Sequence, residues 1–464
     1  MPWPTTSTPR PTQPGSASSC PILASLDSGD TVVDHPRGAR HAHDPHRPIG
    51  PTRFPRHRRP GPRRGPLMEW REARATVHRF GAEMPRATER VALQDAVGRT
   101  LAGAVHSLTA LPSFASSAMD GWAVSGDEPW ILGAPILAGD PPPTTVLAAG
   151  TARPIATGAC VPAGTHGILR SENGELVPGS AAGTVPTLIR SAHTGAHEPA
   201  RGEHVRARGE ECGLDERMLE PGCLLTVPRI ALAAVTGHDT LTVTTQPTVE
   251  LLLLGTEVIE SGIPGPGQVR DAYSPEFPAL LSGLGVRLSA LRRLPDDLDQ
   301  TIDAIRSSTA ALVISTGGSA RGPADHLRAA LAALGASVLI DGVRMRPGHP
   351  VMLARLADGR LMLCLPGNPL AAMLVLASLG VPLIDGMLGR PLVPLGRVTL
   401  AHDIANLSGS TRLVAYRLTD DGAVPTARQG SGMLRGLAEA DGVAVVPAGG
   451  ACSPEPVATI PLPW

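Results

Sequence analysis

The spacing of apolar residues changes several times along the chain, and each change marks a predicted domain boundary. Residues 67–106 carry apolar positions at helical spacing, whereas 107–203 hold short alternating runs that Gly and Pro interrupt, as in strands. A mixed pattern returns over 204–247. We therefore predict an N-terminal mixed domain built from 67–106 and 204–247, with a β-rich insertion domain, 107–203, between its two parts.

Residues 248–390 alternate between buried-strand and amphipathic-helix patterns. The runs VELLLLG and ALVIST are almost wholly apolar, and helical patterns such as DDLDQTIDAIRSS follow them, with acidic residues in the first turn. This strand–helix alternation predicts a mainly parallel sheet covered by helices on both faces. The remaining segment, 391–464, has only short strand patterns and turns. The predicted fold class is a multidomain α+β protein with a central α/β domain, the β-rich insertion and a small C-terminal all-β domain.

Composition and charge narrow the function classes. Residues 1–66 are rich in Pro, Ser, His and Arg without hydrophobic periodicity, which predicts a disordered tail. The net charge of -1 argues against a general nucleic-acid binder. We find no secretory signal pattern and expect no apolar run near twenty residues, so a cytoplasmic protein without a membrane partner is predicted. The chain contains no lysine, so any anion site must use arginine, histidine or backbone N–H groups.

Candidate chemistry gathers in the loops that follow the predicted strands of the 248–390 region. Ligands of open α/β sheets bind at the carboxyl ends of the strands. The loops STGGSARGPAD and CLPGNP are rich in Gly or Pro, and each opens a helix whose N-terminus favours an anion. The carboxylates Glu257, Asp296 and Asp325 belong to the same edge. Each feature alone is also typical of a structural turn or a helix start, but together they suit a phosphate ester bridged by Mg²⁺.

These motifs, in this order, resemble the molybdopterin molybdenumtransferase family, which is related to the C-terminal part of gephyrin. The resemblance covers the chain from about residue 67 to its end, and SAMDG together with LPGNP is its most specific part. The matching text is PSFASSAMDGWAV (112–124), IATGACVPAG (155–164), RARGEE (206–211), the GTE loop, STGGSARGPAD, MRPGHP (345–350), CLPGNP (364–369) and QGSGML (429–434).

The resemblance implies an elongated four-part subunit that forms a homodimer, with the site between the insertion domain of one subunit and the α/β domain of the other. The implied reaction uses Mg²⁺, inserts molybdate into adenylylated molybdopterin and releases AMP. Implied protein partners are a molybdopterin adenylyltransferase and molybdoenzymes. The sequence does not decide whether molybdate or tungstate is preferred, or whether Met1 is the true start.

The family's functional positions carry over to individual residues of this chain. The implied catalytic residues are Asp120, Thr157, Glu257, Asp296 and Asp325, and the last three are also candidate Mg²⁺ ligands. Without the family, Asp120 is a turn residue and Thr157 a strand-end threonine as readily as a ligand. The expected cofactor-binding residues are Ser315, Thr316, Gly317, Gly318, Ser319, Gly322, Arg346, Pro347, Gly348, His349, Pro366, Gly367, Asn368 and Pro369.

The chain departs from the family pattern at several of these loops. Thr256 stands where the family has an acidic residue, His349 replaces a lysine, and the Asp-Ser/Thr-Asn loop becomes Asp271-Ala272-Tyr273. His349 is largely neutral at pH 7 unless its environment changes that. These departures suggest a divergent paralogue. They leave two alternatives to an enzyme open, namely a molybdopterin carrier without catalysis and a scaffold that uses residues 1–66.

Overall fold

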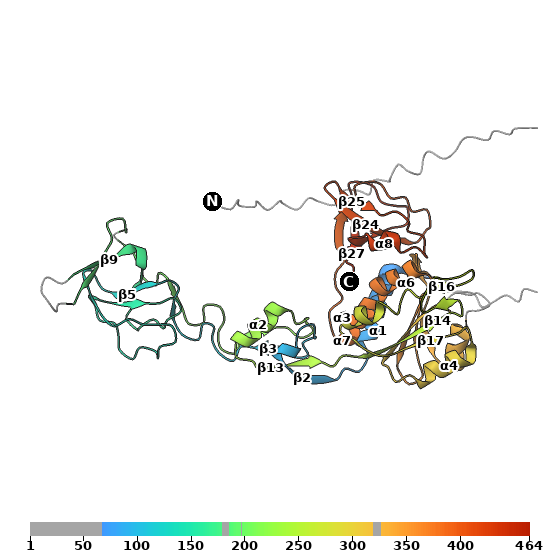
Figure 1. The fold of residues 1–464 in the computed structure, drawn as a ribbon, viewed down its shortest axis with the longest axis horizontal. Helices are drawn as coiled ribbons and strands as arrows, with labels where there is room; N and C mark the ends of the chain where they lie inside the picture. Colours follow the sequence, from blue (N-terminus) through green and yellow to red (C-terminus); the bar gives the residue numbers. More distant parts are fainter. Residues whose placement is uncertain (1–66, 179–184, 196, 319–325) are drawn as a thin grey trace, which may run out of the picture. The chain divides into compact units, whose positions relative to one another are not determined.

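The computed structural model describes residues 67–178, 185–195, 197–318 and 326–464. These residues form two compact units that we describe separately (Figure 1). The first unit contains 67–79, 248–384 and 392–464, and the second contains 80–247 and 385–391. Most of the first helix, residues 70–79, thus packs with the α/β region rather than with the segment that follows it. The five-part domain division stays a prediction, because this two-way division is coarser.

The centre of the first unit is a six-stranded, mainly parallel sheet, as predicted. Four neighbouring strands run parallel, and two further strands complete one edge, the first of them antiparallel to both of its neighbours. In spatial order the strands are β17 (Arg287–Leu294), β14 (Thr248–Leu254), β18 (Leu312–Thr316), β22 (Leu361–Leu365), β21 (Met352–Arg355) and β19 (Ser337–Asp341).

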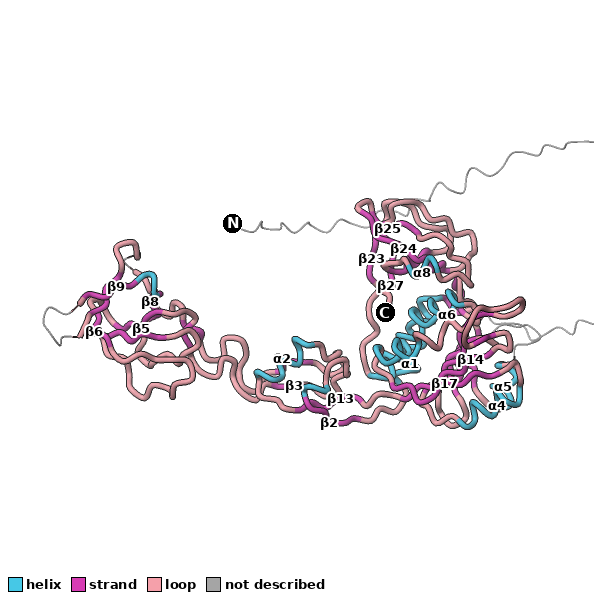
Figure 2. Tube along the Cα trace, viewed as in Figure 1, coloured by secondary structure: helices cyan, strands magenta, loops and turns pink. Residues whose placement is uncertain are grey.

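Helices cover both faces of this sheet (Figure 2). On one face, apolar side chains of α4 (Leu298–Ser307) and α5 (Leu327–Ala333) pack on the strands in a buried cluster. Helices α3 (Phe277–Gly283) and α6 (Pro369–Val375) lie on the other, with α1 (Trp70–Ala82) on the same side (Figure 1). The central strands β14, β18 and β22 are therefore buried on both faces, which explains why their sequences are mostly apolar.

One helix contradicts the expectation that no apolar run approaches twenty residues. Helix α6, a π-helical segment Leu376–Gly380 and α7 (Val381–Leu388) form a continuous helix of 20 residues, Pro369–Leu388. By length and composition it could cross a membrane, but most of its residues are buried inside the protein. A core helix that is enclosed on all sides has no polar face, so its sequence resembles a membrane span.

The C-terminal segment forms a seven-stranded sheet together with strands from earlier in the chain. Strand β20 (Val343–Arg346) pairs with β24 and also with β1 (Met68–Glu69), so the α/β region and the C-terminal sheet share a strand. The remaining elements are β23 (Gly396–Thr399), β24 (Thr411–Thr419), β25 (Gly422–Pro425), α8 (Arg435–Ala438), β26 (Gly442–Val446) and β27 (Pro456–Ile460).

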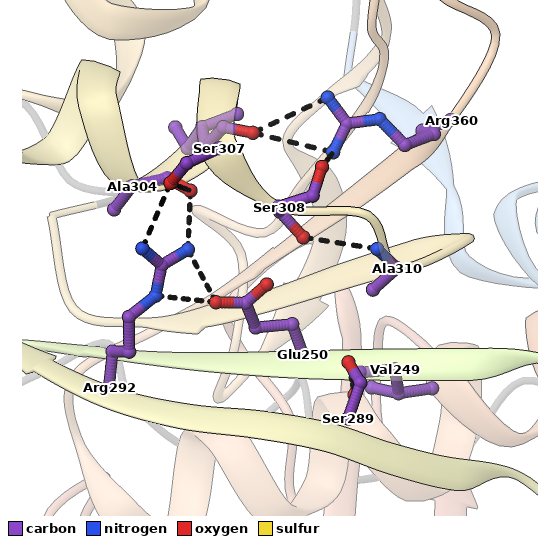
Figure 3. Close-up of polar contacts among 10 residues, drawn as sticks. Val249, Glu250, Ser289, Arg292, Ala304, Ser307, Ser308, Ala310 and Arg360 are labelled. Carbon is purple, nitrogen blue, oxygen red and sulfur yellow. Dashed lines mark hydrogen bonds and ion pairs between the residues drawn. The ribbon is translucent and has the colours of Figure 1, made fainter.

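A buried ion pair fastens the end of α4 to the sheet (Figure 3). The Glu250 side chain on β14 is only 5% exposed and receives a hydrogen bond from Arg292 Nε on β17 at 2.5 Å. Arg292 also donates to the Ala304 carbonyl at 2.5 Å and to Ser307 Oγ at 3.1 Å. Arg360 donates to other carbonyls at the same helix end. The two guanidinium groups thus satisfy carbonyls that a helix terminus leaves without partners.

The second unit holds a small mixed subdomain and a β-rich subdomain. In the β-rich part, a six-stranded sheet surrounds an apolar centre that includes Ala123, Ile136 and Ile168. Its strands, in spatial order, are β8 (Gly167–Arg170), β5 (Gly121–Ser125), β7 (Thr151–Ile155), β6 (Trp130–Leu132), β10 (Thr187–Arg190) and β9 (Gly174–Val177).

Short paired strands and an α-helix lie in the rest of the described part of the second unit. The helix is α2 (Val227–Val235), and a separate core holds Leu101, Leu225 and Val243. The pairs are β11 (Val205–Arg206) with β4 (Ser116–Ser117), β12 (Arg217–Leu219) with β3 (Val105–His106), and β13 (Thr240–Thr244) with β2 (Thr88–Ala92).

Candidate functional site

A cavity of about 690 Å³ opens at the carboxyl ends of β14, β18 and β22. Leu254, Thr316 and Pro366, each at or just beyond the end of one of these strands, contribute to its wall. The loops predicted from Gly and Pro content therefore converge, because carboxyl ends of parallel strands meet at one sheet edge. We call this space the first cavity.

Two of the predicted catalytic carboxylates, Glu257 and Asp296, line the first cavity. The loops that carry them are fastened to each other through Thr256. Its N–H donates to Asp296 Oδ2 at 3.2 Å, and its Oγ1 accepts from the Asp296 N–H at 3.0 Å. The Asp296 carbonyl also contacts the ring of His326, with Nε2 at 3.0 Å. Thr256, which departs from the family pattern, therefore positions one of the carboxylates.

Glycine backbone forms another part of the first cavity's lining, which we call the glycine wall. Gly317 has a φ of +85°, and a Cβ there would lie 2.7 Å from the Leu254 carbonyl oxygen. A Cβ on Gly367 would lie 3.3 Å from the Gly317 Cα, so the β18 and β22 loops are in close contact. Only glycine permits both this backbone conformation and this approach. Gly318, Asn368 and Pro369 continue the same wall.

A third loop, Asp271 to Ser274, closes the first cavity and was not predicted as part of the site. The Asp271 carboxylate is 1% exposed and pairs with Arg293 Nη2 at 3.0 Å. Burial alone would raise the pKa of Asp271, but hydrogen bonds from Ser274, Tyr273 and Arg293 hold it below its ordinary value. The carboxylate stays ionised and orders the loop.

Tyr273 reaches across from this loop to the glycine wall. Its hydroxyl donates to the Gly367 carbonyl at 2.7 Å. Burial, followed by the nearby carboxyl groups of Glu276 and Asp271, raises the pKa of the Tyr273 phenol, so the donor proton is retained. The only sequence signal was the Asp271-Ala272-Tyr273 departure, which gave no hint of this contact.

A second cavity of about 640 Å³ adjoins the first, and both are lined by Pro350, Pro366 and Asn368. Arg346 and Arg412 line the second cavity. It lies between the α/β region and the C-terminal sheet. Its walls also include the predicted residues Pro347, Gly348 and His349, together with Gln429 and Ser431. Sequence reasoning missed Arg412, which has no motif around it, and Ser431, which lies in the QGSGML motif.

Two more of the five predicted catalytic residues, Asp120 and Thr157, meet within the second unit. Asp120 Oδ1 accepts from the Thr157 N–H at 2.7 Å and from Thr157 Oγ1 at 3.0 Å. These bonds, the backbone one first, hold the pKa of Asp120 below its ordinary value. Asp120 is thus an exposed, ionised carboxylate whose orientation Thr157 fixes.

Not every predicted residue is brought to a cavity. Ser315 is fully buried inside β18 and lines neither cavity, although Thr316 next to it lines the first. Ser319, Gly322 and Asp325 lie outside the described residues. Within the described part of the chain, no group of three or more His, Cys, Asp or Glu residues is placed to hold a metal ion. Of the three predicted metal ligands, Glu257 and Asp296 are the two that the described residues include.

Comparison with protein families covers most of the chain in three consecutive matches. The family described as MoeA N-terminal region (domain I and II) matches residues 68–237. The family described as a probable molybdopterin binding domain matches 250–386, which contains the first cavity's carboxylates. The MoeA C-terminal region (domain IV) matches 397–454.

Individual relatives agree with these matches. A molybdopterin molybdenumtransferase of Synechococcus elongatus is 31% identical over 386 residues, which cover 79% of this chain and 92% of that protein. One from Staphylococcus aureus strain Mu50 is 28% identical over 62% of this chain and 71% of its own length. The molybdopterin biosynthesis MoeA protein of Pyrococcus horikoshii OT3 has a similar fold, with a TM-score of 0.67 at 19% identity, over 85% of this chain and 100% of that one.

Proposed function

This chain belongs to the molybdopterin molybdenumtransferase family, and we propose that it inserts molybdenum from molybdate into adenylylated molybdopterin, with Mg²⁺, and releases AMP. It is a transferase of molybdenum cofactor biosynthesis. The observation that supports the detailed reaction is the first cavity, where Glu257 and Asp296 face one space with the glycine wall.

The donor chemistry of the first cavity fits Mg²⁺. The ion takes hard oxygen ligands, commonly one or two carboxylates together with substrate phosphate oxygens. Glu257 and Asp296 would supply those carboxylates, and Asp325 remains a predicted third. When bound, Mg²⁺ would neutralise charge that develops on the phosphoanhydride.

The chain's own residues would hold the substrate in place. Backbone around Gly317, Gly318 and Gly367 is shaped for close approach by a phosphate group, since no side chain stands between it and the cavity. Thr256 holds the Asp296 loop in place by two hydrogen bonds. Positioning and charge neutralisation therefore account for the proposed catalysis.

The second cavity suits molybdate, a small oxyanion. Arg346 and Arg412 provide guanidinium groups there, whose several N–H donors match an oxyanion better than a point charge does. Arg412 also donates to the Ala405 carbonyl at 2.9 Å, which fixes its side chain in the wall. Because the two cavities adjoin, molybdate held in the second would lie next to the substrate in the first.

The function is tested by mixing the purified chain with molybdopterin-adenylate, Mg²⁺ and molybdate and following AMP release. Asp296→Asn removes a carboxylate from the cavity, and we expect AMP release to fall at least about 100-fold. Asp297→Asn is the matched control, because Asp297 caps α4 by accepting from the Gln300 N–H, and asparagine caps equally well.

The outcomes separate the enzyme from the carrier. Release by the wild type and by Asp297→Asn, lost in Asp296→Asn and in Asp325→Asn, supports the proposed reaction. Tight binding of molybdopterin-adenylate without AMP release supports the carrier instead. Deleting residues 1–66 should leave AMP release unchanged. The scaffold alternative predicts in addition that the full-length chain captures a partner protein in a pull-down and that the chain without residues 1–66 does not.

The remaining parts of the proposal come from the family resemblance. We propose a cytoplasmic homodimer that receives its substrate from a molybdopterin adenylyltransferase and passes its product to molybdoenzymes. Light scattering of the purified chain tests the dimer directly.

A further inference from the structure

We propose that Tyr273 is a positioning residue for this transfer, acting through the peptide that joins Gly367 to Asn368. The inference rests on the proposed function and adds a residue to it. Among the described residues that line the first cavity, Tyr273 is the only aromatic one. Its side chain is not a loose wall element, because Tyr273 is 8% exposed and its hydroxyl donates to a backbone carbonyl of the glycine wall.

Tyr273 is held at three points. Its N–H donates to Asp271 Oδ1 at 2.8 Å, and its ring packs against Phe277 with centroids 5.2 Å apart and planes inclined by 59°. The third point is the 2.7 Å hydrogen bond from its hydroxyl to the Gly367 carbonyl. A side chain whose backbone, ring and hydroxyl are all fixed can impose a geometry on its partner at little entropic cost.

The partner peptide lies just before α6, where Asn368 is the N-cap and its side chain donates to Ser431 Oγ at 3.2 Å. Gly367 has no side chain, and its Cα region packs against Gly317 on the other side. Because a peptide unit is planar and trans, the carbonyl directed at Tyr273 sends the Asn368 N–H in the opposite direction. Tyr273 thus determines which way an N–H donor at the cavity wall points.

This loop is also tied to the strand that leads to a catalytic carboxylate. Asp271 pairs with Arg293 on β17, three residues before Asp296. Arg293 in turn pairs with Glu260 at 3.2 Å, in the loop that follows Glu257. A continuous series of contacts therefore runs from the loops that carry Glu257 and Asp296, through Arg293, Asp271 and Tyr273, to the Gly367 carbonyl.

The test compares Tyr273→Phe with Tyr416→Phe in the full-length chain. Tyr416 is the chain's other tyrosine, is also buried, and shares a hydrogen bond with Thr459 Oγ1 at 2.9 Å in the C-terminal sheet. Each variant loses one hydroxyl. For Tyr273→Phe we expect kcat for AMP release to fall by about threefold to tenfold, the equivalent of one neutral hydrogen bond, with the KM for molybdate unchanged. For Tyr416→Phe we expect less than a twofold change.

A second measurement needs no turnover. Hydrogen exchange at the Asn368 amide of the substrate-free protein should accelerate in Tyr273→Phe and not in Tyr416→Phe, because only the first variant releases the peptide. Equal kcat in the two variants would overturn the inference, whatever the exchange rates. If the wild type releases no AMP, the proposed reaction is wrong. The positioning role of Tyr273 is then tested by the dissociation constant of each variant for molybdopterin-adenylate. Weaker binding by Tyr273→Phe alone supports the positioning role, and equal or absent binding overturns it.

Discussion

Removing Arg292 should destabilise the first unit far more than a surface arginine would. Arg292→Met leaves the Glu250 carboxylate, 5% exposed, without its cation and leaves the Ala304 carbonyl with only the longer hydrogen bond from Ser307 Oγ at 3.3 Å. Breaking a buried pair by removing one partner costs about 3–5 kcal/mol. The Arg292 side chain is 34% exposed, so water replaces part of what it supplies, and we expect a loss of about 3 kcal/mol.

Removing both the Glu250 and the Arg292 charge should lower the free energy of unfolding by less than the sum of the two single losses. Glu250→Leu alone should cost about 1–2 kcal/mol, because Arg292 keeps its bonds to α4 and reaches solvent. The double variant Glu250→Leu/Arg292→Met leaves no buried charge without a partner. Its free energy of unfolding should fall by about 1 kcal/mol, because α4 loses the hydrogen bonds that Arg292 donates. The double variant should therefore be more stable than Arg292→Met by about 2 kcal/mol.

Hydrogen exchange in increasing urea, read from peptides that cover residues 248–310, measures these losses within the first unit. Exposed Arg306→Met, whose partner Asp303 is 74% exposed, is the control and should cost less than about 1 kcal/mol. The reasoning is refuted if Arg292→Met costs no more than that control, or if the two single losses simply add in the double variant.

Two further predictions concern local geometry. Thr157→Val removes the hydroxyl bond to Asp120 and should raise the pKa of that carboxyl toward its ordinary value, whereas Thr157→Ser should not, as an NMR titration would show. Since the pKa of Asp120 is depressed in the folded state, this bond stabilises the fold above the ordinary pKa, and the stabilisation is lost as pH falls through the folded-state pKa. An unchanged Asp120 pKa in Thr157→Val would contradict the role given to the Thr157 hydroxyl. Gly348→Ala should lower stability by about 1–3 kcal/mol, because φ is +104° and a Cβ would lie 2.5 Å from Val375 Cγ2. Gly283→Ala, with open space around it, should be neutral in thermal unfolding, and equal losses in both variants would refute the steric argument.

The sequence was sufficient to predict the α/β sheet and the loops at its carboxyl edge. Apolar runs identified the strands, and Gly and Pro marked the turns, so Glu257, Asp296 and Gly367 could be placed at one edge from topology alone. Thr157 and Asp120 lie 37 positions apart, and both were predicted only as positions implied by the family resemblance; the hydrogen bonds between them are seen only in the structure.

Other features depend on packing that a linear pattern does not encode. Ser315 and Thr316 are adjacent hydroxyl residues and both are buried, yet only Thr316, at the end of the strand, lines the cavity. Tyr273 contacts a carbonyl 94 positions away, and strand β20 joins a sheet whose other members come mainly from the C-terminal segment. Long-range contacts of this kind carry no local periodicity, so only the folded chain shows them.

The most direct test of the central claim is a crystal structure of the chain with molybdopterin-adenylate, with Mn²⁺ in place of Mg²⁺ so that anomalous scattering locates the ion. We predict the substrate's phosphate groups in the first cavity against Gly317 and Gly367, with the ion bound by Glu257 and Asp296. A substrate bound elsewhere, or an ion that contacts neither carboxylate, would contradict the account.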